Sequence, residues 1–292
     1  MLNLQHKLQG MKLTTIEADS WKMDGGVAFG VVPKSMWMKV YPDDGDNLIK
    51  ITTRCLLVQL PDRNILIDAG MGDKRDMKYY SHRHRFGTSG FNEPLKKAGL
   101  SPADITDVLF THLHDDHVGG ATYLDKTGEI LETFPNASYW CSEAQWEWSK
   151  NSNRREAAAF FSDNLEPLEK SGKLQLISQD GTWLPEIELR MYNGHTRGQI
   201  IPFIRYGDST VVFLADFIPA RAFIPIPYVP SVDIEPLLTL KEKEAFLHEA
   251  ALNGYILLFQ HDYFHEACHV EQGEKGIVAV DELKISHLIN YS

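Results

Sequence analysis

The stretch LFTHLHDDHVGG, residues 109–120, places three histidines and two aspartates within six consecutive positions, directly after an apolar run. Neutral imidazole and ionised carboxylate are ligands that zinc, iron and manganese take in proteins. His112 and His114 stand two positions apart, so both side chains point the same way in an extended segment. A turn at Asp115 would swing the last aspartate and histidine round to a second position. The spacing therefore favours two metal ions, and a polar loop of hydrogen-bonded histidines is the less favoured interpretation.

Three further candidate ligands stand where other apolar segments end. His195 lies in the glycine-flanked turn MYNGHTRGQ, and His261 follows the apolar run of YILLFQHD. Asp216 ends the run VVFLADF, where an unpaired buried carboxylate would be costly. The predicted metal ligands are therefore His112, His114, Asp116, His117, His195, Asp216 and His261.

Strand and helix patterns alternate along the chain. Strands are predicted over residues 49–60, 65–70, 105–112, 137–142, 173–178, 187–195, 199–217 (a hairpin turning at Gly207 and Asp208) and 255–262. Helices are predicted after a capping box of Ser142 and Gln145, over residues 153–170 and over residues 234–253. Strand pairs and helices recur in two successive halves, which predicts an α+β fold of two sheets packed face to face with helices outside. No linker or repeat divides the chain, so a single domain over residues 1–292 is expected.

The composition limits the partners. The 292 residues are 43% apolar and 24% charged, which is typical of a globular protein. The formal charge of -11 disfavours nucleic acid and anionic membranes and favours a neutral or cationic small molecule. No signal peptide or membrane span is evident, so a cytoplasmic protein is expected. The three cysteines match neither a disulfide framework nor a metal motif.

These residues give the sequence a resemblance to the metallo-beta-lactamase superfamily, whose HxHxDH motif appears here as residues 112–117. The resemblance implies an αββα sandwich with two divalent metal ions at one edge between the sheets. Zinc is the expected metal, with iron, cobalt or manganese as alternatives. The resemblance also implies two ligand groups bridged by Asp216: His112, His114 and His195 for one metal, and Asp116, His117 and His261 for the other. The segment IDAG, residues 67–70, is similar to an early strand-turn of the family in which the aspartate, here Asp68, supports the site from behind the ligands.

Residues 23–42, together with the histidine motif, are similar to the YtnP-type lactonases, which open N-acyl homoserine lactones and so quench quorum sensing. The resemblance implies that a hydroxide held between two metals attacks the lactone carbonyl. Asp116 is then the expected catalytic residue that moves a proton to the leaving oxygen. Residues 20–45 are predicted to form a loop that either overhangs the site or makes a homodimer contact. An overhanging loop would offer three apolar side chains to an acyl chain: Phe29, Met36 and Trp37.

One position departs from the best-known lactonases, which carry a tyrosine three residues after the bridging aspartate. That position is Pro219 here, and Tyr192 or Tyr228 is the candidate to replace the missing hydroxyl. Alternative substrates for the same site are a carboxylic ester, a phosphotriester of the methyl parathion hydrolase kind, or a thioester of the glyoxalase II kind. A non-catalytic metal-binding module is a further alternative, which the complete ligand set disfavours.

Overall fold

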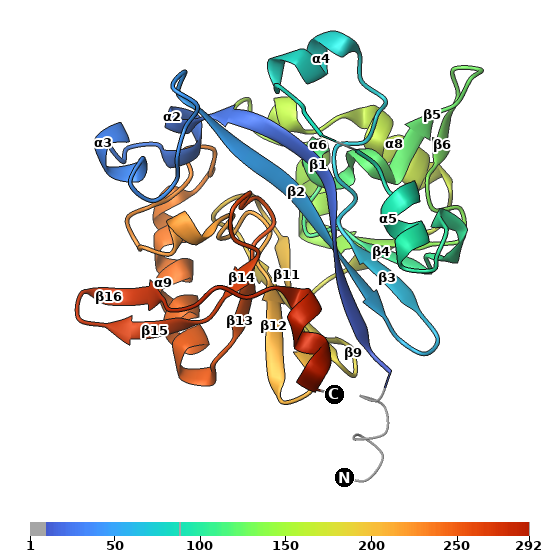
Figure 1. The fold of residues 1–292 in the computed structure, drawn as a ribbon. Helices are drawn as coiled ribbons and strands as arrows, with labels where there is room; N and C mark the ends of the chain where they lie inside the picture. The colour runs from blue at the N-terminus through green and yellow to red at the C-terminus, as the bar shows by residue number, and fades with distance from the viewer. Residues whose placement is uncertain (1–9, 88, 292) are drawn as a thin grey trace.

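Two six-stranded sheets pack face to face and carry helices on their outer sides (Figure 1). The structure is a computed structural model that describes residues 10–87 and 89–291. The first sheet has the order β1 (Lys12–Asp24), β2 (Leu48–Gln59), β3 (Asn64–Ile67), β4 (Asp107–Leu109), β7 (Ser138–Ser142) and β8 (Leu174–Ile177). The second sheet has the order β14 (Ala267–Cys268), β13 (Ile256–Leu258), β12 (Ser209–Phe213), β11 (Gln199–Tyr206), β10 (Ile187–Tyr192) and β9 (Gly181–Leu184). The predicted α+β sandwich is confirmed.

The longest helix, α9 (Pro236–Asn253), packs beside the second sheet (Figure 1). It starts with proline in its first turn and ends at Gly254, whose φ of 63° is left-handed. The shorter helices are α2 (Gly25–Phe29), α3 (Lys34–Trp37), α4 (Met77–His82), α5 (Asn92–Lys97), α6 (Asp115–Val118), α7 (Glu143–Lys150) and α8 (Ser162–Lys170). Two small hairpins complete the described strands: β5 (Thr122–Leu124) with β6 (Ile130–Glu132), and β15 (Val270–Gly273) with β16 (Gly276–Ala279). In the described part of the chain, no helix combines the length and apolar character needed to cross a membrane.

The predicted loop over residues 20–45 begins inside a strand. Residues up to Asp24 belong to β1, which pairs antiparallel with β2 along its whole length and shifts register between Glu17 and Asp19. Because β1 is rich in polar residues, hydrophobic periodicity does not reveal it as a strand. Its backbone hydrogen bonds come from long-range pairing with β2. Beyond Asp24 the segment folds into α2 and α3.

The core lies on both faces of the first sheet, and β2 shows why. Its Leu56 and Val58 join the core shared with the second sheet, whereas Cys55 and Leu57 join a separate core that includes residues of α5, α7 and α8. A strand buried on both faces reads as a continuous apolar run without alternation. The run that predicted this strand therefore also reflects its burial on both faces.

The topology brings the carboxyl ends of several strands to one edge. In the first sheet β3 and β4 are parallel neighbours, so Asp68 and the start of the histidine motif follow adjacent strand ends. In the second sheet β12 is parallel to β13 and two antiparallel steps from β10. Asp216, His261 and His195 follow these three strands. Segments far apart in sequence therefore meet at the edge between the two sheets.

Gly120 in the histidine stretch allows the turn after α6 to approach β3. Its backbone N–H donates to the carbonyl of Gly70 at 2.8 Å, and a Cβ at this position would overlap the carbonyl oxygen of Ala69. We expect Gly120→Ala to lower the free energy of unfolding by about 3 kcal/mol, because backbone atoms cannot move aside as a side chain can. Urea unfolding of the metal-free protein measures this effect.

Gly128→Ala is the matched control for that substitution. Gly128 has a φ of 87° but meets no atom within 4 Å, so alanine there should cost only about 1 kcal/mol from backbone strain. Equal destabilisation by the two substitutions would contradict the steric explanation.

Candidate metal centre

Seven side chains gather at the edge between the sheets in two groups. Within each group the candidate ligand atoms all lie within 4.8 Å of one another. The first ligand group is His112, His114, His195 and Asp216, and the second ligand group is Asp116, His117 and His261. The structure thus brings together all seven predicted ligands with the predicted division between them. This cluster could bind metal ions.

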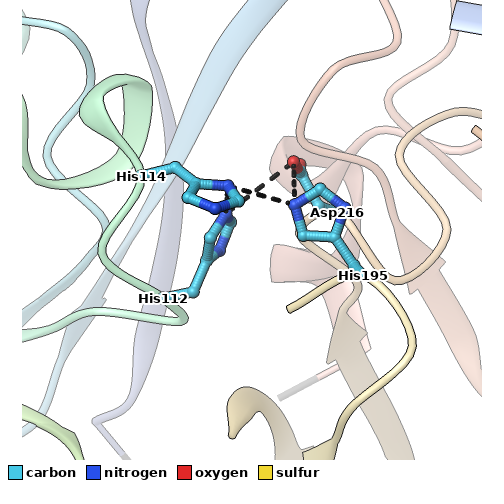
Figure 2. A group of neighbouring side chains, drawn as sticks. All are labelled: His112, His114, His195 and Asp216. Atoms are coloured by element: carbon cyan, nitrogen blue, oxygen red, sulfur yellow. Dashed lines mark hydrogen bonds and ion pairs between the residues drawn. The ribbon is translucent and has the colours of Figure 1, made fainter. Parts of the chain in front are cut away.

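Ring nitrogens and one carboxylate oxygen face a common point in the first ligand group (Figure 2). The Nε2 of His195 is 3.0 Å from Asp216 Oδ2, and the Nε2 of His112 is 3.8 Å from the same oxygen. His114 presents its other nitrogen: its Nδ1 lies 3.0 Å from His112 Nε2 and 3.2 Å from His195 Nε2. Two of these residues come from the first half of the fold and two from the second.

The second ligand group uses the other oxygen of Asp216. Its Oδ1 lies 2.7 Å from His261 Nε2 and 3.5 Å from His117 Nε2. Asp116 completes the group, with Oδ1 3.6 Å from His117 Nε2 and Oδ2 3.7 Å from His261 Nε2. Asp216 is therefore arranged to bridge the two groups with one oxygen on each side.

The chemistry of these donors fits a pair of metal ions. Asp216 Oδ1 is buried and accepts no hydrogen bond, although His261 Nε2 is only 2.7 Å away. A ring nitrogen and a carboxylate oxygen that lie this close without forming a hydrogen bond are expected when both point at a third atom. Imidazole and carboxylate ligands without cysteine suit zinc, iron or manganese.

Charge compensation within the cluster also fits cation binding. Burial lowers the pKa of His112 well below its usual value, so this imidazole is neutral. Burial disfavours the charged form of His195 too, but the carboxylates of Asp216 and Asp233 raise its pKa to about 10. Burial also disfavours ionised Asp216, yet the neighbouring imidazoles of His261 and His195 hold its pKa well below the usual range. Cations would replace these protons as the partners of the carboxylates, so metal binding should release protons.

Each of the five imidazoles has its other ring nitrogen held by a partner outside the cluster. Such contacts fix the tautomer and the ring orientation of a metal ligand. The pairs are His112 with Thr111 Oγ1 at 3.1 Å, His114 with Glu156 at 2.9 Å, His117 with Asp68 at 2.9 Å, His195 with Asp233 at 2.9 Å, and His261 with the Thr52 carbonyl at 2.8 Å. Of the three carboxylates, sequence analysis identified only Asp68. Glu156 and Asp233 stand in segments that carry no metal-site motif.

Asp68 connects the site to the first sheet. It has a left-handed φ of 59° and is fully buried, directly after β3. Its carboxylate accepts from the backbone N–H and hydroxyl of Thr111, both at 2.8 Å, and from Gln260 Nε2 at 3.0 Å. It also lies 2.9 Å from His117 Nδ1. The residues before His112 and His261 are thus held by the carboxylate that orients His117.

The family follows from the match of the sequence to a model of the metallo-beta-lactamase superfamily over residues 51–261. The matched range begins in β2 and ends at the last candidate ligand, His261. The chain belongs to the metallo-beta-lactamase superfamily.

Similar proteins include lactonases and other hydrolases. The N-acyl homoserine lactonase AiiB of Agrobacterium fabrum is 35% identical over 95 residues, which span 30% of this chain and only 34% of that relative. A probable metal-dependent hydrolase from Staphylococcus aureus is 29% identical, with a TM-score of 0.84 over 94% of this chain and 98% of that structure. AidC, a dizinc quorum-quenching lactonase solved with a product, is 21% identical, with a TM-score of 0.76 over 94% of this chain and 95% of that structure. The likeness to AidC shows the fold alone.

The candidate metal centre of this superfamily member lies at the floor of a cleft with two branches. Both branches are lined by Asp116, His195 and Asp216 from the centre, together with Trp21 and Met23 of β1. The apolar branch continues along Ala28, Tyr41, Ile49, Ile51 and Phe223. The polar branch continues along Arg83, Asp115, Arg155, Glu156 and Ser231. A molecule bound at the centre can therefore place unlike groups in the two branches.

The predicted acyl-contact residues lie beside or behind this cleft and do not line either branch. Phe29 and Trp37 are buried and stack at 5.0 Å between ring centroids, and Phe29 stacks on Phe223 at 4.7 Å. They form the layer behind the apolar wall, and Ala28 and Phe223 reach the cavity instead. Met36 is 48% exposed. A homodimer contact through this segment stays a prediction.

Neither tyrosine predicted to replace the missing hydroxyl lines the described cleft. Tyr192 stacks on Phe217 with ring centroids 4.1 Å apart, and Tyr228 packs against the edge of Phe29. The tyrosine on the cleft wall is Tyr41, but its hydroxyl donates to the carbonyl of Lys50 at 2.7 Å. Pro219 itself lines the apolar branch.

Proposed function

We propose that this chain is a dinuclear metal-dependent hydrolase that opens N-acyl homoserine lactones, with zinc as the metal. One observation supports this function above the others: two ligand groups share Asp216 at the floor of a cleft that divides into an apolar and a polar branch. The lactonase activity named for AiiB and the dizinc lactonase AidC agree with it.

The residues of the centre divide the chemistry among them. When bound, two divalent cations would supply Lewis acidity, which polarises a substrate carbonyl and lowers the pKa of water. The five imidazoles and the carboxylates of Asp116 and Asp216 would hold these cations. Asp116 also lines both branches, so its carboxylate can take the proton that the attacking water loses and pass it to the leaving oxygen. This transfer leaves a hydroxyl group on the former ring oxygen, and the new carboxylic acid at the other end of the opened ring ionises and releases a proton.

The two branches suit the two ends of an N-acyl homoserine lactone. The apolar branch would take the acyl chain, because its walls are aliphatic and aromatic side chains. The polar branch would take the lactone ring, with the guanidinium of Arg83 as a hydrogen-bond donor. The same two branches would accommodate a carboxylic ester or a phosphotriester. These are the second candidate substrates, because the described cleft offers no free tyrosine hydroxyl of the kind found in the best-known lactonases.

Proton release on mixing the purified protein with N-acyl homoserine lactones tests the function, since ring opening produces an acid. The metal content is measured first, and lactones with short and long acyl chains are compared. Two bound metals with lactone opening would support the proposal. Two bound metals without lactone opening would end the lactonase assignment and direct the search to aryl esters and phosphotriesters.

Ala28→Phe should change the preference for acyl-chain length. Ala28 lies on the apolar branch and is buried, so a phenyl ring there would occupy the space proposed for the distal part of a long chain. We expect kcat/KM to fall by about 10–100-fold for a long-chain lactone and to change little for a short-chain one. Val27→Phe is the control, because Val27 stands on the same helix but is 42% exposed. A uniform loss for both lactones would argue against the acyl branch.

A further inference from the structure

Glu156 is a buried carboxylate in the segment between α7 and α8 that lies beside the first ligand group. It is 5% exposed, and its Oε1 lies 2.9 Å from His114 Nε2. The same oxygen accepts from the hydroxyl of Thr196, and Oε2 accepts from Trp148 Nε1 at 2.6 Å. Three donors therefore hold the carboxylate in one orientation.

The contact with Glu156 determines which nitrogen His114 can present to a metal. Among the five candidate histidine ligands, His114 alone turns its Nδ1 toward the cluster; the others present Nε2. With Nε2 hydrogen bonded to a carboxylate, the proton resides on Nε2 and the Nδ1 lone pair is free to bind. A half-turn of the ring would remove both interactions.

Glu156 also connects the two halves of the fold at this point. His114 belongs to the loop after β4 in the first sheet, whereas Thr196 directly follows His195 in the loop after β10 in the second sheet. One carboxylate oxygen contacts both residues. Its position therefore sets the relative placement of two ligands that belong to different sheets.

We propose that Glu156 is a positioning residue that orients His114 and holds it in register with His195 in the first ligand group. This inference rests on the proposed metal-dependent function and extends it to a residue outside the ligand set. Because the second ligand group makes no direct contact with Glu156 in the described structure, the effect should concentrate on one of the two metals.

Metal affinity measured by competition with a chromophoric zinc chelator tests the proposal independently of activity. Glu156→Ala should lower the affinity for one of the two zinc ions by about 10–100-fold and leave the affinity for the other near its wild-type value. Glu156→Gln should also lower the affinity for that zinc ion, because the new amide NH₂ would face the Trp148 N–H. The double variant E156Q/W148F removes this donor conflict, so it should bind the weakened zinc ion more tightly than E156Q alone.

Two controls separate positioning from general damage. Glu147→Gln changes an exposed carboxylate on α7 and should leave both affinities unchanged, and W148F alone reports the loss of the indole. Circular dichroism and urea unfolding of the metal-free variants show whether each one folds, and E156Q serves if E156A does not.

Wild-type affinity for both zinc ions in folded E156A and E156Q would overturn the proposal. The proposal would also be overturned if E156Q/W148F bound the weakened zinc ion no more tightly than E156Q. Recovery of affinity in the double variant requires that the hydrogen bond to His114 controls metal binding. A wild-type protein that binds two zinc ions but opens no lactone would end the lactonase proposal and leave this one standing.

Discussion

Asp216→Ala is expected to reduce the bound metal below two ions per chain and to lower lactone turnover by about 10³-fold or more. Asp216 faces His195 with one oxygen and His261 with the other, at 3.0 and 2.7 Å. Its removal takes a ligand from both groups at once and leaves two buried histidines without their shared carboxylate. Atomic emission spectroscopy gives the metal content, and proton release from a lactone gives the turnover.

Asp208→Ala is the matched control for this experiment. Asp208 lies in the exposed turn before β12, at the opposite end of this strand from Asp216. Its alanine variant should retain two metals and full turnover. A metal-free Asp216→Ala protein with wild-type activity would refute the dinuclear mechanism.

The candidate ligands could be predicted from sequence because two independent patterns coincide. Four ligands lie within one short motif, Asp216 and His261 end apolar runs, and His195 lies in a glycine-flanked turn after a predicted strand. Strand ends at one edge of a sandwich converge, so the pattern of strands carries spatial information that the isolated residues lack. The structure confirms the fold on which that reasoning depended.

The residues that hold the ligands could not be predicted in this way. The predicted helix over residues 153–170 is interrupted: a single 3₁₀ turn spans Ala157–Ala159, and α8 begins only at Ser162. Helix propensity favours the whole run, but Glu156 is drawn toward His114 and Thr196. A tertiary contact overrides a weak local preference here. A buried glutamate in a helix-forming run gives no sequence signal of its own.

The aromatic residues of the segment after β1 illustrate a second limit. An overhanging loop would turn Phe29 and Trp37 toward an acyl chain, but both are buried in a stack behind Phe223. Large aromatic side chains supply much of the apolar area that a core can bury, so a short helical segment folds them inward. The smaller Ala28 is left on the cavity wall. Composition predicted an apolar segment near the site but not which of its side chains reach the cleft.

Asp68→Asn should damage stability and metal binding together. An amide at this position keeps one acceptor oxygen but replaces the other with an NH₂ group. That group would face donors from which the carboxylate now accepts hydrogen bonds, among them the Thr111 hydroxyl, His117 Nδ1 and Gln260 Nε2. We expect the free energy of unfolding to fall by about 2–4 kcal/mol, since buried donors lose their partner. Metal affinity should fall by about 10–100-fold because His117 loses the contact that orients it. Asparagine tolerates the left-handed φ of 59°, so backbone strain does not confuse the comparison.

Asp107→Asn separates the two effects, because Asp107 is also buried but stands at the start of β4, where it accepts from Trp140 Nε1 at 2.9 Å. Its asparagine variant should lose stability and keep both metals at wild-type affinity. If Asp68→Asn instead loses stability without losing metal affinity, Asp68 serves only the fold. The expected joint loss would mean that one buried carboxylate links the strand ends to the ligands, so that folding of the first sheet and assembly of the metal site depend on the same hydrogen bonds.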